Sequence, residues 1–381
     1  LALTKLLGLG LDPQDLAAWF DNQYGFAARE EYEVAAIAQA DAVIGCLPDQ
    51  LDVLPRVYGL RTRREVITPG IAPVFFDVGA AGGDRLDPEI PARFGLIPGQ
   101  FIIVTSRLAQ TKNIAGAVKL LGEARALAPA RFGRVALAVV GGNAQPREPE
   151  ELAVEDSIAT AMAQYHLHGD DVRRIPAQPW PVIAQLLRQS LFYVGMQHFE
   201  PFGMGAAEAL AAGVPVLLSR YAGIARVLEG DASRPPCALL VDPDDPRGAA
   251  HSLIMALAAP AELKRMVDAG RTFATQTLSW PNGAARLLAI LDDLVARGAP
   301  SRQRALCGQH RLTSAWRGDR PRIAPHHAWS AEQLLPRIVE LQQVAARAHR
   351  RLIVAIGGES GSGKTEIAHC LGIALRSHRL W

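Results

Sequence analysis

The sequence has few cysteines, no long apolar run and almost no net charge. Its cysteines show no paired spacing: Cys46, Cys237, Cys307 and Cys370. This pattern excludes the dense disulfide framework of small secreted domains, and Cys307 with His310 supplies only half of a zinc motif. No apolar stretch is long enough to cross a bilayer, and no signal peptide is recognisable. We therefore expect a cytoplasmic protein without a membrane span.

The charge balance gives no sign of a nucleic-acid partner. The 40 basic and 38 acidic residues leave a formal net charge of +2. A basic cluster from Arg302 to Arg322 is local, and we interpret it as part of a linker between domains. We expect small-molecule ligands and no nucleic acid.

At 381 residues the chain can form two or three domains with apolar cores. The first residue is Leu1 and a helical pattern is already under way there, so we expect a fragment at both ends. Changes in composition and periodicity predict five segments: 1–68, 69–99, 100–297, 298–328 and 329–381. The segments 69–99 and 298–328 are rich in Pro, Gly or Arg and are expected to be a connector and a linker.

Segment 100–297 alternates apolar strands with amphipathic helices. The predicted strands are FIIVTSR from Phe101, VALAVVGG, LFYVGM, PVLLS and LLVDP, and the predicted helices cover about 114–128, 152–165, 246–258 and 280–296. This rhythm predicts an α/β fold with a parallel sheet wrapped by helices. Ligands of such sheets bind at the carboxyl ends of the strands, so the turns there are the candidate site.

Two of these turns carry cations or glycines. Arg107 and Lys112 follow the first strand and could neutralise a diphosphate, although two solvated cations at a helix start are an equally simple interpretation. Gly141 and Gly142 follow the next strand and would allow a close backbone approach to a ligand. A plain tight turn would also explain them.

The third turn, HFEPFGMGAAE, is the most informative. A helix is expected to start near Met204, and its free N–H groups and dipole favour an anion. Glu208 lies about one turn inside this helix and could accept hydrogen bonds from ribose hydroxyls, while Glu200 on the preceding loop could reach sugar hydroxyls. Taken singly, each acid could instead be a helix-dipole partner or a solvated side chain.

Taken together, the turns resemble the donor domain of the retaining family 4 glycosyltransferases. Five elements in order carry the likeness: Arg-x4-Lys, Gly-Gly, Glu-x7-Glu within EPFGMGAAE, AAGVPV and ALLVDPDD. The resemblance covers roughly residues 30–295, and the stretch REEYEVAAIAQADAVI is more specifically similar to sucrose-phosphate synthase and sucrose synthase relatives. It implies two Rossmann-like domains facing a cleft, the GT-B arrangement, with 1–68 as the C-terminal part of the acceptor domain and 100–297 as the donor-binding domain. The first part of the acceptor domain is expected to lie outside this sequence.

The resemblance also implies roles for individual residues. Arg107, Lys112 and Glu200 would be catalytic, the two cations on the donor diphosphate and the acid beside the donor sugar. Glu208 would hold the ribose, and the remaining donor contacts would come from Gly141, Gly142, Phe202, Gly203 and Met204. The implied reaction transfers a hexose, with retention, from a nucleotide sugar such as UDP-glucose to a sugar or sugar-phosphate acceptor. It requires no cofactor and no metal, and Asp242 and Asp244 belong to the ALLVDPDD element.

One element departs from the family pattern. In SRYAGIARVL, Ala222 replaces the first of two glycines, and the acid that usually follows is absent.

The end of the chain carries a second motif, GESGSGKT. Residues 358–365 fit G-x4-G-K-[ST] between the strand LIVAI and an expected helix, as a P-loop requires. Here Gly358, Gly361, Gly363 and Lys364 would bind ATP phosphates and Thr365 would ligate Mg²⁺. The motif resembles small-molecule P-loop kinases, and 329–381 would be the first βα unit of such a domain. The alternatives to a glycosyltransferase are therefore an ATP-dependent kinase or NTPase with a ligand-recognising middle domain, or a non-catalytic sensor of sugar nucleotides.

Overall fold

The chain divides into two compact units, one formed by Pro69–Ala284 and the other by Leu1–Thr68 with Ala285–Trp381. The computed structural model describes residues 37, 40–59, 61–76, 86–142, 148–229, 235–297 and 325–347. The predicted P-loop at 358–365 and most of the predicted linker lie outside these residues. Within the described ranges, no helix is both long and apolar enough to span a bilayer.

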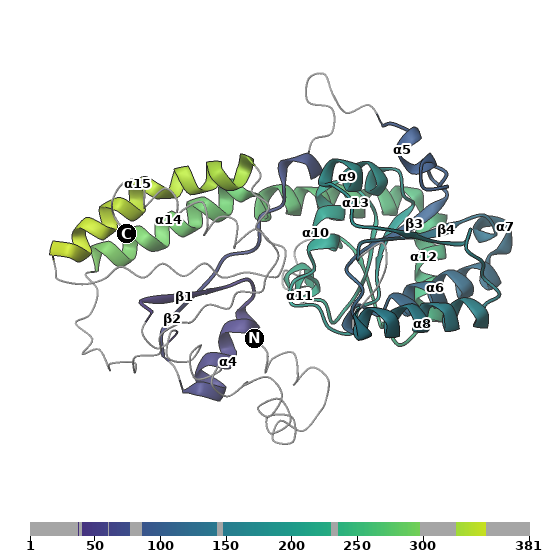
Figure 1. The fold of residues 1–381 in the computed structure, drawn as a ribbon, viewed down its shortest axis with the longest axis horizontal. Helices are drawn as coiled ribbons and strands as arrows, with labels where there is room; N and C mark the ends of the chain where they lie inside the picture. Colours follow the sequence, from purple (N-terminus) through teal and green to yellow (C-terminus); the bar gives the residue numbers. More distant parts are fainter. Residues whose placement is uncertain are drawn as a thin grey trace. The chain divides into compact units, whose positions relative to one another are not determined.

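The unit Pro69–Ala284 is built on a six-stranded sheet whose strands are all parallel, as the sequence predicted (Figure 1). Its order is β5-β4-β3-β6-β7-β8. The strands are β3 (Phe101–Thr105), β4 (Ala136–Val140), β5 (Val172–Ile175), β6 (Phe192–Gly195), β7 (Val216–Ser219) and β8 (Leu239–Val241). The chain winds outward in one direction from β3 and in the other from β6. A ligand crevice is expected where this order reverses, at the carboxyl ends of β3 and β6.

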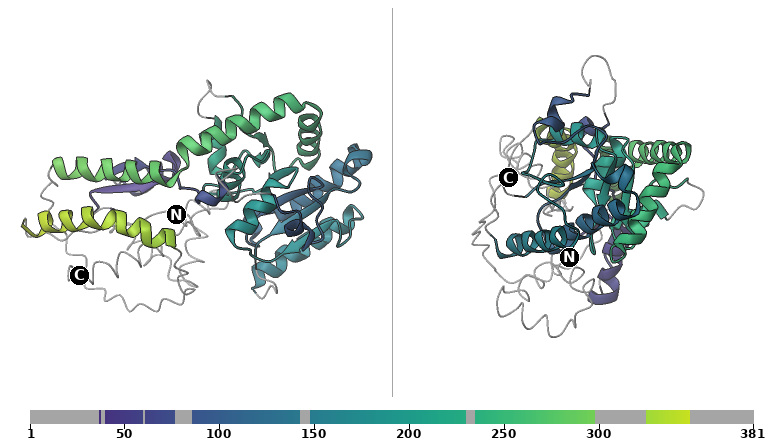
Figure 2. Two further views of the ribbon diagram at one scale, coloured as in Figure 1. Left: turned by 90° about the horizontal axis from the view of Figure 1, so that it is seen from above. Right: turned by 90° about the vertical axis from the view of Figure 1, so that its right-hand side faces the viewer.

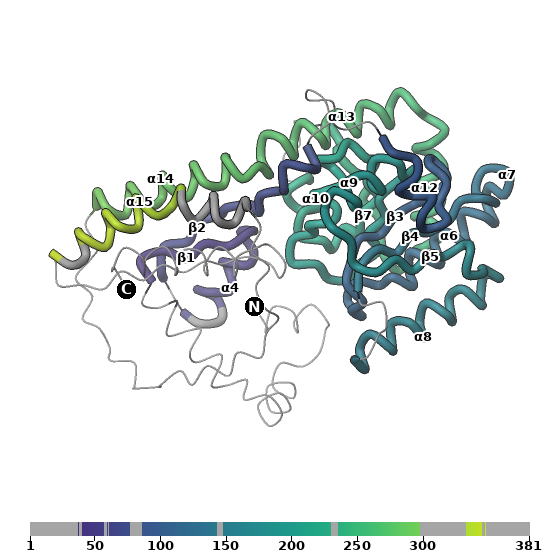
Figure 3. The backbone as a smooth tube through the Cα atoms, turned by 45° about the horizontal axis from the view of Figure 1, so that its top comes forward, coloured from purple at the N-terminus to yellow at the C-terminus, as the bar shows by residue number. Residues whose placement is uncertain are grey.

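Helices cover both faces of the sheet (Figures 1 and 3). On one face α6 (Ile114–Leu127), α8 (Pro149–Gln164) and α12 (Pro246–Ala258) pack together, and on the other lie α9 (Trp180–Arg188), α10 (Met204–Ala211) and α13 (Pro260–Thr277). The shorter helices of this unit are η1 (Pro73–Phe75), α5 (Glu89–Ala92), η2 (Gln110–Lys112), α7 (Pro129–Phe132) and α11 (Gly223–Glu229). The predicted helix 246–258 is confirmed, and the one predicted from residue 152 begins three residues earlier.

The central strands are buried because both of their faces are covered. Residues 101–104 of β3 and 192–194 of β6 are at most 5% exposed, and these uninterrupted apolar runs are typical of a parallel sheet between two helix layers. Strand β5 was not predicted, because its sequence VRRI places two arginines in the middle. It lies at the sheet edge, where Arg174 forms an ion pair with Glu155 at 2.6 Å and Arg173 one with Asp170 at 2.8 Å.

Residues 69–76 and 86–99, the expected connector, pack onto this same unit. Phe75 is fully buried, and Arg188 donates a hydrogen bond to the carbonyl oxygen of Val74 at 2.7 Å. Gln189 similarly donates to the carbonyl oxygen of Asp87 at 3.0 Å.

The described part of the second unit contains a parallel strand pair, the helix α4, the end of helix α14 and the helix α15. Strands β1 (Ala42–Gly45) and β2 (Arg63–Val66) are joined by α4 (Pro48–Tyr58). Helix α14 (Trp280–Ala296) has the predicted bounds, and its last twelve residues belong here. Helix α15 (Pro325–Arg347) lies beside it, with an ion pair between Arg337 and Asp292 (Figures 1 and 2).

Position 141, in the turn after β4, requires glycine because this turn lies directly against the turn after β3. Gly141 has φ 130°, and a Cβ there would lie 2.3 Å from the carbonyl oxygen of Ser106. Its amide donates to Ile175 at 2.9 Å, which holds the turn in place. The two turns that carry Gly141 and Arg107 are therefore in contact.

We predict that Gly141→Ala lowers the free energy of unfolding by about 2 kcal/mol or more, because both the positive φ and the carbonyl contact oppose a side chain. Thermal unfolding of the full chain would show this as a lower Tm. Gly169→Ala is the matched control, since a Cβ at Gly169 would meet no atom within 4 Å. Equal Tm values for the two variants would contradict the prediction.

Candidate functional site

The predicted residues Lys112 and Glu200 meet at the point where the strand order reverses. Lys112 ends η2, which follows β3, and Glu200 lies on the loop between β6 and α10. Their side chains form an ion pair in which the amine of Lys112 contacts Oε2 of Glu200. The two side chains are 17% and 7% exposed. The fold therefore brings together two residues that lie 88 positions apart in the sequence.

The backbone around Glu200 is fixed on the side of β7. The carbonyl oxygen of Glu200 accepts from the amide of Gly223 at 2.9 Å, and Glu200 forms an isolated parallel bridge with Ala222. The other carboxylate oxygen, Oε1, is buried and has no hydrogen-bond partner in the part of the chain that the structure describes. A buried acceptor without a donor is costly, so Oε1 is suited to a ligand hydroxyl.

Ala222, the departure from the family pattern, fits this bridge. It is fully buried, and its φ is not positive, since Asn113 and His166 alone among the described non-glycine residues have a positive φ. The glycine of the usual pattern is therefore not needed for the backbone to reach Glu200.

Arg107 lies at the same edge of the sheet and is exposed. Its guanidinium makes no hydrogen bond or ion pair with any residue in the described ranges, and its carbonyl oxygen accepts from Ser106 Oγ at 2.9 Å. The guanidinium is thus available to an anion, whereas the amine of Lys112 is already paired. A free guanidinium beside the crevice suits a phosphate group, which it can bind through two parallel hydrogen bonds.

Helix α10 begins directly after Gly203, as the sequence predicted for Met204. Gly203 has φ 111°, and a Cβ there would meet Ile224 at 3.1 Å and Glu200 at 3.6 Å. Phe202 is fully buried and anchors the turn, and its carbonyl oxygen accepts from Ile224 at 2.6 Å. The N-terminus of α10 is therefore held next to Glu200.

Glu208 lies in the middle of α10 and is half-buried. Burial raises the pKa of its carboxyl from 4.5 to about 8, with no other contribution of note. The acid is therefore largely protonated at neutral pH without ligand. An acid that burial keeps protonated, with no stabilising partner among the described residues, is a candidate ligand-binding group.

The glycine turn after β4 lies beside the loop after β5. Gly142 has φ 74°, and its carbonyl oxygen accepts from the amide of Ala177 at 3.2 Å. Gly141 and Gly142 thus leave a backbone surface without side chains next to the Arg107 turn.

Three further side chains lie at this edge: Asn113, His198 and Asp244. Asn113 caps α6 by accepting from Gly116 at 3.1 Å and donates to the carbonyl oxygen of Met196 at 2.8 Å. His198 lies 2.9 Å from Asp244 through Nε2. The only sequence signal for Asn113 was its position directly before a helix, which favours an N-cap.

The described residues contain no cluster of three His, Cys, Asp or Glu side chains that could hold a metal ion. Asp242 instead accepts from the amide of Asp244 at 3.0 Å, which shapes the turn after β8.

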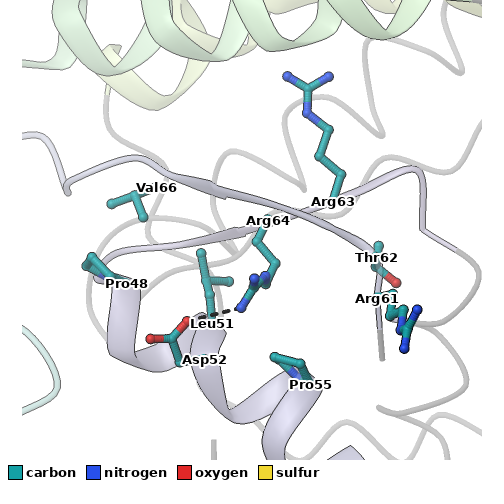
Figure 4. A pocket seen from close by; sticks show the side chains of 9 residues that line it. All are labelled: Pro48, Leu51, Asp52, Pro55, Arg61, Thr62, Arg63, Arg64 and Val66. Atoms are coloured by element: carbon teal, nitrogen blue, oxygen red, sulfur yellow. Dashed lines mark hydrogen bonds and ion pairs between the residues drawn. The ribbon is translucent and has the colours of Figure 1, made fainter. Parts of the chain in front are cut away.

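A separate pocket of about 460 Å³ lies in the β1–α4–β2 region (Figure 4). It is lined by Pro48, Leu51, Asp52, Pro55, Arg61, Thr62, Arg63, Arg64 and Val66. Two of its arginines are already paired, because Arg64 bonds Asp52 at 3.0 Å and Arg63 bonds Glu65 and Asp293. None of the residues predicted for donor binding lines this pocket.

Comparison with known proteins agrees with this geometry. Residues 90–273 match the family described as Glycosyl transferases group 1. The chain is 26% identical over 307 residues to mannosylfructose-phosphate synthase of Agrobacterium fabrum, covering 77% of this chain and 62% of that protein. It is 30% identical over 266 residues to D-inositol 3-phosphate glycosyltransferase of Thermobifida fusca, covering 68% and 57%. The chain thus spans well over half, but less than two thirds, of these relatives.

Solved structures share the fold. Sucrose-phosphate synthase of Thermosynechococcus elongatus superposes with a TM-score of 0.58 at 23% identity, covering 71% of this chain and 63% of that one. HepE of Anabaena, solved in complex with UDP, superposes with a TM-score of 0.55 at 16% identity, covering 68% and 65%. The predicted α/β fold of glycosyltransferase type is confirmed.

We predict that ionisation of Glu208 makes the free energy of unfolding fall as the pH rises. Because the pKa is raised in the folded state, the folded chain holds a proton that the unfolded chain releases between about pH 4.5 and 8, so the free energy of unfolding falls across this window by up to about 1.4 kcal/mol per pH unit. Glu208→Gln removes this contribution. The Tm difference between the variant and the wild type should therefore grow from pH 5 to pH 8.

Glu229→Gln, at an exposed position at the end of α11, is the matched control, since it makes the same chemical change where the side chain is exposed. A Tm difference for Glu208→Gln that changes with pH no more than that of Glu229→Gln would contradict the prediction.

Proposed function

We propose that the protein transfers a hexose from a nucleoside diphosphate sugar to a sugar or sugar-phosphate acceptor with retention of configuration. The observation that carries the proposal is the meeting of Lys112 and Glu200 where the strand order reverses, at the sheet edge that also carries Arg107, whose guanidinium has no partner among the described residues. This juxtaposition places cations for a diphosphate next to a carboxylate for a sugar. The match of residues 90–273 to group 1 glycosyltransferases supports the same assignment.

In the proposed complex, Arg107 and Lys112 bind the donor diphosphate. The backbone N–H groups at the start of α10, from Phe202 to Met204, add partial positive charge on the same side. These groups stabilise the negative charge that develops on the leaving diphosphate as the glycosidic bond breaks. The sugar passes through an oxocarbenium-like state, so positioning and leaving-group stabilisation supply the catalysis.

Two carboxyl groups orient the donor. Oε1 of Glu200 accepts a hydrogen bond from a sugar hydroxyl, which satisfies its buried lone pairs. Glu208 receives the two ribose hydroxyls, which favour its ionised form. The glycine surface at Gly141 and Gly142 lets the donor lie close to the sheet.

The names of the relatives support one class of donor and one class of acceptor. HepE was solved with UDP and glucose, and a trehalose-6-phosphate enzyme of E. coli with UDP-2-fluoro glucose, which favours a UDP-sugar donor. Mannosylfructose-phosphate synthase, D-inositol 3-phosphate glycosyltransferase and sucrose-phosphate synthase all carry a phosphorylated polyol or sugar in their names. We therefore favour a phosphorylated acceptor.

The P-loop sequence at 358–365 stays a separate prediction. No comparison and no described residue bears on it, and donor binding at the sheet does not depend on it.

Calorimetric titration of the full chain with UDP-, GDP- and ADP-glucose tests the proposal. One of them should bind, and the double variant Lys112→Ala, Glu208→Ala should lose at least about a hundredfold in affinity, because it removes a charge-assisted phosphate contact and the ribose acceptor. Lys264→Ala is the control, since this exposed lysine on α13 pairs with Asp268 away from the strand ends. Absence of binding by all three, or undiminished binding by the double variant, would refute donor binding at this site.

A further inference from the structure

The side chains of Lys112 and Glu200 form an ion pair within the site. Both side chains are largely buried, so the attraction between them is screened less than that of a surface pair. Lys112 cannot turn fully to a phosphate group without weakening this pair. Removing the partner of a buried charge is strongly unfavourable. An arriving diphosphate therefore competes with Glu200 for the amine.

The backbone of Glu200 is held in place. Its carbonyl oxygen accepts from the amide of Gly223 at 2.9 Å, and its backbone is bridged to Ala222. If the amine leaves, the carboxylate keeps no donor among the described residues, because Oε1 already lacks one and Lys112 is the donor to Oε2. Loss of the ion pair thus leaves a charged group that something else must satisfy.

We propose that this ion pair makes the site discriminate between the sugar-bearing donor and the spent nucleoside diphosphate. A nucleotide sugar draws Lys112 onto its diphosphate and offers sugar hydroxyls to Glu200 in exchange. A free nucleoside diphosphate carries the same phosphates but no sugar hydroxyl. Its binding leaves the carboxylate of Glu200 without a hydrogen-bond donor, which lowers its affinity. Glu200 is then a specificity-determining residue that favours donor capture and product release.

Arg107 differs from Lys112 in having no ion-pair partner among the described residues. Its guanidinium has no partner in the described residues, so nothing has to be broken when it binds a phosphate. It should contribute equally to the affinity for both ligands. This inference rests on the proposed function, since it assigns the diphosphate and the sugar to the same two side chains.

The experiment compares UDP with UDP-glucose, or the base that the first titration selects, on the full chain. In Glu200→Gln the amine is released from its charged partner, so UDP should bind about fivefold or more tightly than to the wild type. The ratio of UDP-glucose affinity to UDP affinity should fall by at least the same factor. Glu200→Asp, whose shorter side chain withdraws from Lys112, should change both quantities in the same direction.

Two controls isolate the ion pair. Arg107→Gln should weaken both ligands by a similar factor and leave the affinity ratio unchanged. In Lys112→Ala the further change Glu200→Gln should no longer strengthen UDP binding, since the amine that it frees is gone. Tm values of all variants establish that they are folded.

The outcomes separate the two proposals. UDP affinity that is unchanged or weaker in both Glu200 variants, with wild-type binding of UDP-glucose intact, would overturn the role of the ion pair and leave the proposed function standing. Absence of wild-type binding to any nucleotide or nucleotide sugar would overturn both.

Discussion

The site depends on one electrostatic contact, the ion pair between Lys112 and Glu200 across the reversal of strand order. The strand order and the backbone hydrogen bonds around Glu200 position the two residues of this pair. The order β4-β3-β6-β7 brings the two loops together, and the carbonyl oxygen of Glu200 is held by the amide of Gly223. Because parallel strands all end at the same edge, residues 88 positions apart become neighbours without any local sequence preference for each other.

Around this contact, the loops are shaped by positions that few residues can occupy. Gly141 and Gly203 adopt positive φ where a side chain would meet a carbonyl oxygen or Ile224. Glu208 is half-buried in α10 without a partner among the described residues, and burial opposes its ionisation. An acid of this kind reduces the stability of the free protein at neutral pH, and a ligand that pairs with it is the simplest reason for its presence.

The sequence was informative where physical requirements are local. Uninterrupted apolar runs predicted β3, β4, β6 and β7, and the EPFG turn predicted the start of α10 at Met204. It was uninformative where the outcome depends on partners that the local pattern does not identify. VRRI was not predicted as a strand because its arginines are compensated by ion pairs, Arg174 with Glu155 and Arg173 with Asp170. The pairing of Lys112 with Glu200 and the orphaned Oε1 follow from tertiary geometry, so no spacing rule could reveal them. The loop at Ala222 was an apparent defect in the pattern, yet its backbone still reaches Glu200.

Asn113 connects two loops of the site through a single amide group. Its oxygen accepts from the amide of Gly116 in the first turn of α6, and its nitrogen donates to the carbonyl oxygen of Met196 directly after β6, while its own backbone lies in the left-handed region at φ 46°. An aspartate would keep the cap and replace the second hydrogen bond by repulsion, since a carboxylate has no proton to offer the carbonyl oxygen of Met196. The connection between the residue after Lys112 and the end of β6 therefore depends on the difference between an amide nitrogen and an oxygen.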